Sequence, residues 1–182
     1  MGVRSAYREA AAALGRLLAQ RGTELVYGGG QVGLMGVLAG AALQAGGRVI
    51  GVIPQALSRR ELARMDLTEL HVVASMHERK AMMADLADAF IALPGGFGTC
   101  DEFCEMLTWA QLGIHEKPIG IVNTEGFFDS LLALFEHAIG EGFVPDHHRG
   151  LYIVEDHPAA LLERMSGFTA TRLTSSSEVP RR

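Results

Sequence analysis

The chain has 182 residues, of which 48% are hydrophobic and 20% are charged. This length suits one α/β domain with a sizeable core, and the composition is that of a globular protein rather than a disordered one. The formal net charge is −5 at pH 7 and the sequence has no basic stripe, so we expect no nucleic-acid partner.

The N-terminal residues mix charged and apolar side chains, which predicts an amphipathic helix over Tyr7–Arg21 rather than a signal peptide. Residues 25–47 then carry no charge over a length that would span a bilayer. Three consecutive glycines, Gly28, Gly29 and Gly30, interrupt this run. We therefore interpret it as a strand, a glycine-rich loop and a buried helix, and we expect no membrane partner.

Strand and helix patterns alternate along the chain. Short apolar runs predict strands, and a segment of helical character follows each of them. The predicted strands are Thr23–Tyr27, Arg48–Ile53, Leu70–Val73, Ala89–Leu93, Pro118–Val122 and Leu151–Val154. The segments that follow them are Gly33–Ala45, Ser58–Ala63 (a short helix or a loop), Met76–Leu86, Thr99–Leu112, Phe127–Ile139 and Pro158–Met165.

Continuous apolar strands that alternate with helices indicate a parallel sheet with helices on both faces. We predict a three-layer, doubly wound, Rossmann-like α/β fold in a single domain over residues 1–166. The polar residues 167–182 should form a disordered tail. Every predicted helix follows a strand except Tyr7–Arg21, on which the chain opens. Either the sheet has one strand fewer than its relatives, or its first strand is missing from this sequence.

Cys100 and Cys104 are the only cysteines, and they lie four residues apart on one face of a predicted helix. A structural zinc site needs about four ligands, and no histidine or cysteine pair stands near them in the sequence. We therefore expect no metal and interpret both residues as reduced thiols of a cytoplasmic protein.

The first glycine-rich turn, YGGGQVGLMG, occupies Tyr27–Gly36, where a strand ends and a helix begins. Open α/β sheets bind ligands beyond the carboxyl ends of their strands, and the free N–H groups of a helix start suit a phosphate. The turn satisfies G-x-G-x-x-G, but the next strand ends at Ile53 without the acid of a dinucleotide site, and no P-loop Gly-Lys-Ser/Thr follows. Gly29 and Gly30 therefore serve either tight packing or ligand contact.

The second glycine-rich turn lies in ALPGGFGTCDEF, residues 92–103. The segment Thr99–Glu102 has the spacing of a helix capping box, which would occupy both side chains with backbone N–H groups. Alternatively, the Thr99 hydroxyl and the loop N–H groups hold a phosphate while Glu102 faces the attached sugar. A carboxylate there would stabilise the cationic, oxocarbenium-like sugar of glycoside cleavage or position a water. The residue types leave both interpretations open.

The segment SMHERKAMMADLADAF, Ser75–Phe90, begins a predicted helix with a charged turn. Such a run is usually a solvated face. Cations are disfavoured at helix N-termini, however, so Arg79 and Lys80 at this position indicate that an anion binds there. Lys80 and Lys117 are the only lysines, and nothing in the sequence marks either as a desolvated Schiff-base nucleophile.

Taken together, these segments resemble the LOG family, the cytokinin riboside 5'-monophosphate phosphoribohydrolases that are often mislabelled lysine decarboxylases. The family hallmark PGGxGTxxE is present at Pro94–Glu102, and YGGGxxGLMG at Tyr27–Gly36. MHERK at Met76–Lys80 and LTWAQLGIHEKP at Leu107–Pro118 are also similar to family segments. The resemblance extends from Tyr7 to about Val154.

The resemblance implies a cofactor-independent homodimer that acts in cytokinin activation. It would hydrolyse the N-glycosidic bond of N6-modified AMP, and of AMP itself, to a free base and ribose 5-phosphate. Arg79 and Glu102 match the catalytic pair of the family. The expected substrate-binding residues are Glu61, Arg79, Lys80, Gly95, Gly96, Phe97, Gly98, Thr99, Glu102 and Thr108, together with Gly29 and Gly30 of the first turn.

One departure from the family pattern leaves an alternative open. Family members usually begin with a strand and a Cys-Gly-Ser-Ser-type loop near the nucleotide, and Met1–Ser5 stands in that place here. This departure favours a carrier or sensor of the same fold that binds a nucleotide or cofactor without cleaving it, whereas the pair Arg79 and Glu102 favours the enzyme. A pyridoxal-phosphate lysine decarboxylase is the third interpretation.

Overall fold

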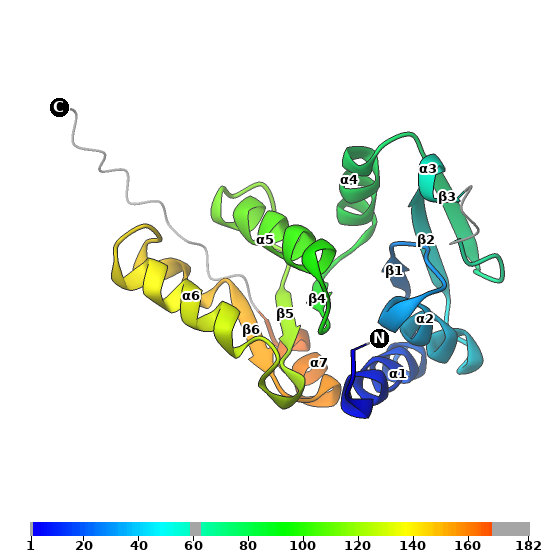
Figure 1. The fold of residues 1–182 in the computed structure, drawn as a ribbon, viewed down its shortest axis with the longest axis horizontal. Coiled ribbons are helices and arrows are strands. Elements are labelled where there is room, and N and C mark those ends of the chain that lie inside the picture. The colour runs from blue at the N-terminus through cyan, green and yellow to red at the C-terminus, as the bar shows by residue number, and fades with distance from the viewer. Residues whose placement is uncertain (1, 59–62, 169–182) are drawn as a thin grey trace.

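The computed structural model describes residues 2–58 and 63–168. Helices and strands alternate along this part of the chain (Figure 1). The strands are β1 Leu25–Tyr27, β2 Val49–Pro54, β3 Glu69–Val73, β4 Phe90–Ala92, β5 Ile119–Val122 and β6 Tyr152–Glu155. The helices are α1 Ser5–Gln20, α2 Gly33–Gln44, α3 Gln55–Leu57, α4 Met76–Leu86, α5 Phe97–Gln111, α6 Asp129–Gly140 and α7 Pro158–Ser166, with 3-10 turns η2 Thr124–Gly126 and η3 Asp146–Gly150.

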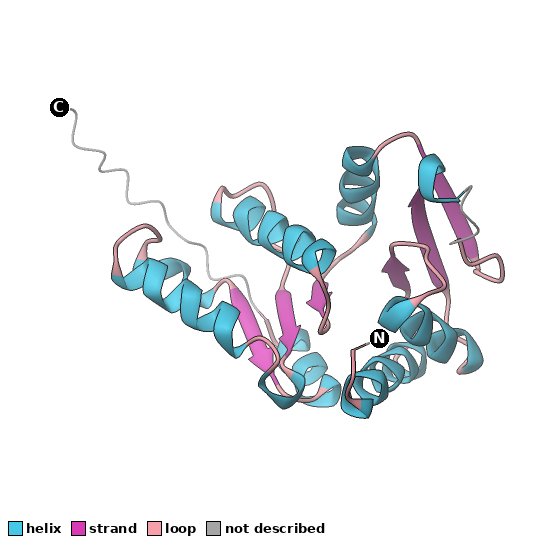
Figure 2. Cartoon of the chain, viewed as in Figure 1, coloured by secondary structure: helices cyan, strands magenta, loops and turns pink. Residues whose placement is uncertain are grey.

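The predicted parallel α/β architecture is confirmed, but the strands form two sheets of three, ordered β1-β2-β3 and β4-β5-β6 (Figure 2). All pairings between these strands are parallel. In the second sheet, Ile119 of the central strand lies opposite Phe90 on one side and Tyr152 on the other. The central strands β2 and β5 are buried along their whole length, as their continuous apolar sequences predict.

Helices cover both faces of the two sheets, and α1 joins them. Ala11 and Leu14 of α1 belong to the core of the first sheet, where α2 also packs, whereas Ala10 belongs to the core that α7 forms with the second sheet. On the opposite faces, α4 contacts all three strands of the first sheet, and α5 and α6 pack on the second. In Figure 1, α1 lies beneath the region where the two sheets approach each other.

Most predicted element bounds agree with the structure to within two residues, and the differences are local. Helix α5 begins at Phe97 rather than Thr99, because Gly96 occupies the N-cap position. The predicted segment Ser58–Ala63 falls largely on residues 59–62, outside the described residues; a short helix precedes it at Gln55–Leu57. Residues 25–47 form a strand, a loop and a helix, as predicted. Across the described residues, no helix has both the length and the apolar character needed to cross a bilayer.

Gly15 sits at a close approach of α1 and α2, since a Cβ atom built on it would collide with the carbonyl oxygen of Leu38. We expect Gly15→Ala to lower the free energy of unfolding by about 1–3 kcal/mol, because backbone atoms cannot yield easily. Gly140 is the matched helical glycine with open space around its Cα, and Gly140→Ala should raise stability by about 0.4–1 kcal/mol. Urea denaturation of both variants measures the contrast, and equal effects would contradict this packing.

Candidate active site

Arg79 occupies the centre of the candidate site, in the first turn of α4. The helix begins with a cap at Ser75, whose hydroxyl accepts from the Glu78 N–H at 3.1 Å, while a Glu78 carboxylate oxygen accepts from the Ala74 N–H at 2.9 Å. These two hydrogen bonds form a capping box, so the Glu78 side chain is used in capping the helix. The next residue, Arg79, turns inward and is only 8% exposed.

Two acceptors hold the buried guanidinium of Arg79. Its Nη1 donates to Oε1 of Glu102 at 2.7 Å, and its Nε donates to the carbonyl oxygen of Val52 at 3.2 Å. The Glu102 side chain is about one-third exposed, so it connects the buried arginine to the solvent-facing side of the site. The structure therefore brings together the two residues predicted as the catalytic pair.

The first glycine-rich turn makes room for this arginine. A Cβ atom at Gly28 would collide with Nη2 of Arg79, so only glycine allows the guanidinium to lie against the loop. Gly29 adopts a positive φ of 72°, which favours glycine, and its carbonyl oxygen accepts from the Arg64 N–H at 2.9 Å. Gly30 forms an isolated bridge with Ala63. In the structure, the glycines of this turn allow it to pack closely against Arg79.

The second glycine-rich turn starts α5. Thr99 lies inside the first helical turn, and its hydroxyl folds back over Gly95, where a Cβ atom would collide with it. The capping-box interpretation of Thr99 and Glu102 is wrong, because Gly96 is the N-cap and Glu102 pairs with Arg79 instead. A Cβ atom at Gly96 would meet nothing within 4 Å, and the same holds for Gly98, so this helix start is open to an incoming group.

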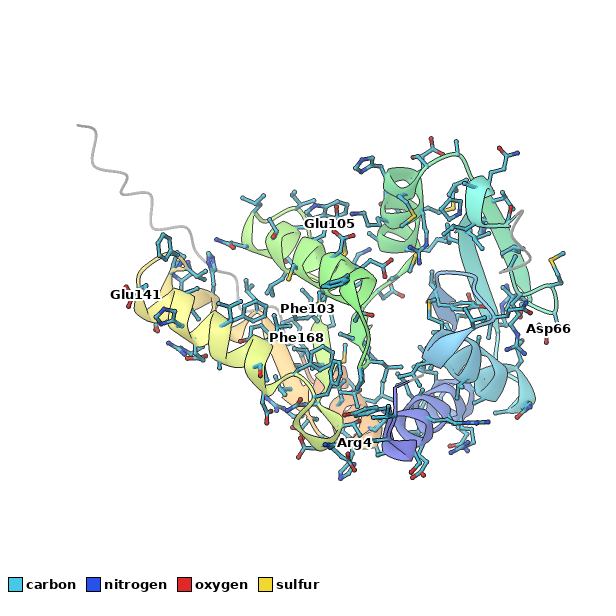
Figure 3. All side chains as sticks on the ribbon, viewed as in Figure 1. Arg4, Asp66, Phe103, Glu105, Glu141 and Phe168 are labelled. Atoms are coloured by element: carbon cyan, nitrogen blue, oxygen red, sulfur yellow. The ribbon has the colours of Figure 1, made fainter. Side chains whose placement is uncertain are left out.

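A cavity of about 160 Å³ lies beside the ion pair. Its polar end carries Thr99 and Glu102 together with Lys80 and Glu105. Its apolar walls come from α4, α5 and the two strands β1 and β4. In Figure 3, Glu105 lies on the side of α5 toward α4, while Phe103 points toward the second sheet.

Lys80 is held by carboxylates on α5. Its Nζ lies 3.0 Å from Oε2 of Glu105 and 3.3 Å from Oδ2 of Asp101. The hydrogen bond to Glu105, and secondarily the one to Asp101, raises the pKa of Lys80 above its usual value. The amine is therefore protonated at neutral pH, which opposes a role as a Schiff-base nucleophile.

Two predicted site residues lie apart from this centre, and a third falls outside the described residues. The Thr108 hydroxyl donates to the carbonyl oxygen of Cys104 within α5 at 2.7 Å, and Thr108 does not line the cavity. Phe97 is almost fully exposed at the start of α5. Glu61 lies outside the described residues. Their roles in substrate binding stay predictions.

The sequence reasoning missed two features of the site. It did not connect Gly28 to Arg79, although the glycine run at a strand end marked a close backbone approach. It also did not pair Lys80 with Glu105, because that contact joins two helices far apart in sequence. Both cysteines are free thiols, and within residues 2–58 and 63–168 no group of three or more His, Cys, Asp or Glu could hold a metal ion.

Because Gly28 gives Arg79 its position, we expect Gly28→Ala to displace the guanidinium from Val52 and Glu102. The Arg79 Nε–H proton should exchange with solvent at least tenfold faster than in the wild type, as followed by nitrogen-15 NMR. Gly96→Ala is the control, because a Cβ atom there meets nothing within 4 Å, and it should leave this exchange rate unchanged. Unaltered exchange in the Gly28 variant would show that the loop does not hold the arginine.

Comparisons with known proteins place this chain in a family. The family model described as "Possible lysine decarboxylase" matches residues 35–165. The probable cytokinin riboside 5'-monophosphate phosphoribohydrolase LOGL1 of Oryza sativa subsp. japonica is 49% identical over 168 residues, which cover 92% of this chain and 75% of that protein. The cytokinin riboside 5'-monophosphate phosphoribohydrolase LOG4 of Arabidopsis thaliana is 46% identical, with 92% and 78% covered.

Solved structures with the same fold are more distant in sequence. The molybdenum cofactor binding protein from Rippkaea orientalis superimposes with a TM-score of 0.68 at 23% identity, covering 90% of this chain and 88% of that one. The molybdenum cofactor carrier protein from Chlamydomonas reinhardtii gives a TM-score of 0.65 at 21% identity, with 91% of each chain covered. These two likenesses establish the fold alone. The family match and the two plant relatives establish that the chain belongs to the LOG family of cytokinin riboside 5'-monophosphate phosphoribohydrolases.

Proposed function

We propose that this protein hydrolyses the N-glycosidic bond of cytokinin riboside 5'-monophosphates, that is, N6-modified AMP, and also of AMP. The bond between C1′ of the ribose and the base breaks, and water supplies a hydroxyl group to C1′ and a proton to the base. The observation that carries the proposal is the 2.7 Å pair of Arg79 and Glu102 beside an open helix start. The relatives named for this activity share almost half of the sequence.

The open start of α5 suits the 5'-phosphate. The first N–H groups of a helix have no partners within the helix, and the positive end of its dipole favours an anion. The loop from Gly95 to Thr99 presents these groups without side chains at three of its five positions. The Thr99 hydroxyl, folded over Gly95, adds one more donor. We assign the phosphate to this loop.

Glu102 lies one helical turn beyond the loop, and we place the ribose of the bound nucleotide next to it. Its carboxylate would stabilise the positive charge that develops on the sugar as the base departs, and would orient the attacking water. Arg79 positions this carboxylate through the hydrogen bond between Nη1 and Oε1, and its positive charge favours a substrate that carries a phosphate.

The two other interpretations receive less support. A pyridoxal-phosphate decarboxylase needs a lysine that loses its proton readily, yet Lys80 is paired with two carboxylates and Lys117 donates to the carbonyl oxygen of Ala84 at 2.7 Å. The carrier interpretation rests on structural neighbours that are at most 23% identical in the cases described above. A carrier that does not cleave its ligand has no use for the ion pair of Arg79 and Glu102.

We also propose that the protein acts as a homodimer in the cytoplasm. Large apolar side chains stand exposed where α5 ends and along α6, among them Leu112, Ile114 and Leu134. Exposed apolar residues that gather on one region commonly mark an interface. Sedimentation velocity measures the assembly state directly.

Base release is the direct test of the activity. The purified protein is incubated with isopentenyladenosine 5'-monophosphate, with AMP and with unphosphorylated isopentenyladenosine, and free base is quantified by chromatography. We expect free base from the two monophosphates and none from the riboside, because the riboside lacks the phosphate that the α5 loop would bind. Tight nucleotide binding without any base release would contradict hydrolysis and support the carrier interpretation.

Replacing Glu102 with Gln removes the negative charge and keeps the shape. We expect Glu102→Gln to lower turnover by about 100-fold or more, since the charge on the sugar then lacks its counterion, while the circular dichroism spectrum stays that of the wild type. Glu116→Gln makes the same chemical change at an exposed position after α5, and it should retain wild-type turnover. Comparable turnover in both variants would remove Glu102 from the mechanism.

A further inference from the structure

The two helices that carry the candidate active site pack on different sheets (Figure 1). Helix α4, with Arg79, contacts all three strands of the first sheet, whereas α5, with Glu102, packs on the second. Side chains bridge the two helices near their starts, where Arg79 reaches Glu102 and Lys80 reaches Asp101 and Glu105. The position of Arg79 relative to Glu102 therefore depends on what holds the spacing of α4 and α5 further along.

Lys117 makes a second connection, at the other end of α4. Its Nζ donates to the carbonyl oxygen of Ala84 at 2.7 Å. The last four carbonyl groups of a helix lack partners within the helix, and a cation there complements the negative end of the helix dipole. Helix α4 has no basic residue in its own last turn. Lys117, which lies between α5 and β5 in the chain, therefore supplies both the donor and the positive charge.

His115 attaches the same segment to α5. Its Nδ1 accepts from the N–H of Lys117 at 3.2 Å, so the ring proton lies on Nε2, which donates to the carbonyl oxygen of Met106 at 3.0 Å. Burial lowers the pKa of His115 most, and the charge of Lys117 lowers this pKa further against the opposing effect of the Met106 carbonyl. The ring is therefore neutral at pH 7, which leaves Nδ1 free to accept.

The contacts of this segment meet beside the candidate active site. The His115 ring packs against Phe90 of β4 with 5.1 Å between the ring centroids. Phe90, Ala84 and Met106 all line the cavity next to the ion pair. Ala84 lies more than one helical turn beyond Arg79 on α4, and Met106 lies one turn beyond Glu102 on α5. We call His115–Lys117 the clamp segment, because it connects α4, α5 and β4 at this level.

We propose that His115 and Lys117 are positioning residues for the hydrolysis proposed above, on which this inference rests. By fixing the spacing of α4 and α5, the clamp segment holds Arg79 where it orients the Glu102 carboxylate toward the sugar. The proposed phosphate loop belongs to α5 alone, so loss of the clamp should leave substrate binding nearly intact. The alignment of Glu102 is what changes, and a small displacement of a catalytic group lowers the rate steeply.

Lys117→Met tests the proposal, because it keeps the aliphatic stem and removes the charged donor. With isopentenyladenosine 5'-monophosphate as substrate, we expect kcat to fall by about tenfold or more while KM changes by less than about twofold. Lys117→Arg restores a donor for the Ala84 carbonyl and should recover most of kcat. Arg164→Met is the matched control, because Arg164 also donates to a backbone carbonyl, that of Val154 at 3.2 Å, without lining the cavity. It should retain wild-type kcat.

A second readout does not depend on catalysis. The Arg79 Nε–H proton should exchange with solvent faster in Lys117→Met than in the wild type, and at the wild-type rate in Arg164→Met, as followed by nitrogen-15 NMR. Urea denaturation confirms that each variant is folded at the assay temperature. If Lys117→Met is not, His115→Phe replaces it, because it keeps a ring against Phe90 and removes both nitrogens. Absence of base release by the wild type would reject the proposed hydrolysis, whereas Arg79 exchange would still test the clamp.

Several outcomes would overturn the proposal. Wild-type kcat and wild-type Arg79 exchange in Lys117→Met would show that the clamp segment does not hold the ion pair. Equal losses of kcat in Lys117→Met and Arg164→Met would indicate general destabilisation. A raised KM with unchanged kcat would assign Lys117 to substrate binding instead of positioning. Nitrogen-15 shifts that place the His115 proton on Nδ1 at neutral pH would contradict the geometry of the clamp segment itself.

Discussion

The ion pair between Arg79 and Glu102 is the constraint on which the arrangement of the site depends. Burying an arginine that is only 8% exposed is costly unless an opposite charge and hydrogen-bond acceptors compensate for the lost hydration of its guanidinium. The compensation comes from different segments: the Val52 carbonyl lies in the first sheet, and Glu102 lies on the helix that follows the first strand of the second. Satisfying one buried charge therefore fixes the two halves of the protein relative to each other.

This constraint explains why the two turns are rich in glycine. Gly28 is small because Arg79 occupies the space that a side chain would take, and Gly95 is small because the Thr99 hydroxyl folds over it. Gly96 and Gly98, by contrast, have open space around them. The glycines thus divide into those that admit a protein side chain and those that leave backbone N–H groups accessible. Only the second kind is suited to a phosphate, which is why we propose the start of α5, rather than the first turn, as the phosphate site.

Much of the fold follows from local sequence, whereas the contacts within the site do not. The strand β2 could be located from its apolar run and the helix α4 from the charged turn that begins it, because both are local signals. The spacing of Thr99–Glu102 allowed a capping box, yet tertiary structure pairs Glu102 with Arg79, 23 residues away. The division of the sheet also escaped prediction. Apolar character shows that β1 and β4 are strands, but pairing between them depends on backbone placement across the whole chain.

The edge strands β1 and β4 and the ion pair of Arg79 and Glu102 belong to the same connection between the two sheets. On the active-site side, Arg79 and Glu102 join the segments that follow β1 and β4, while α1 joins the two cores from below. Between these connections, the backbone groups of Val26 and Ile91 lack a partner strand among the described residues. Because a 1 Å displacement of catalytic groups costs activity steeply, the proposed role of Glu102 requires that these connections hold its carboxylate in place.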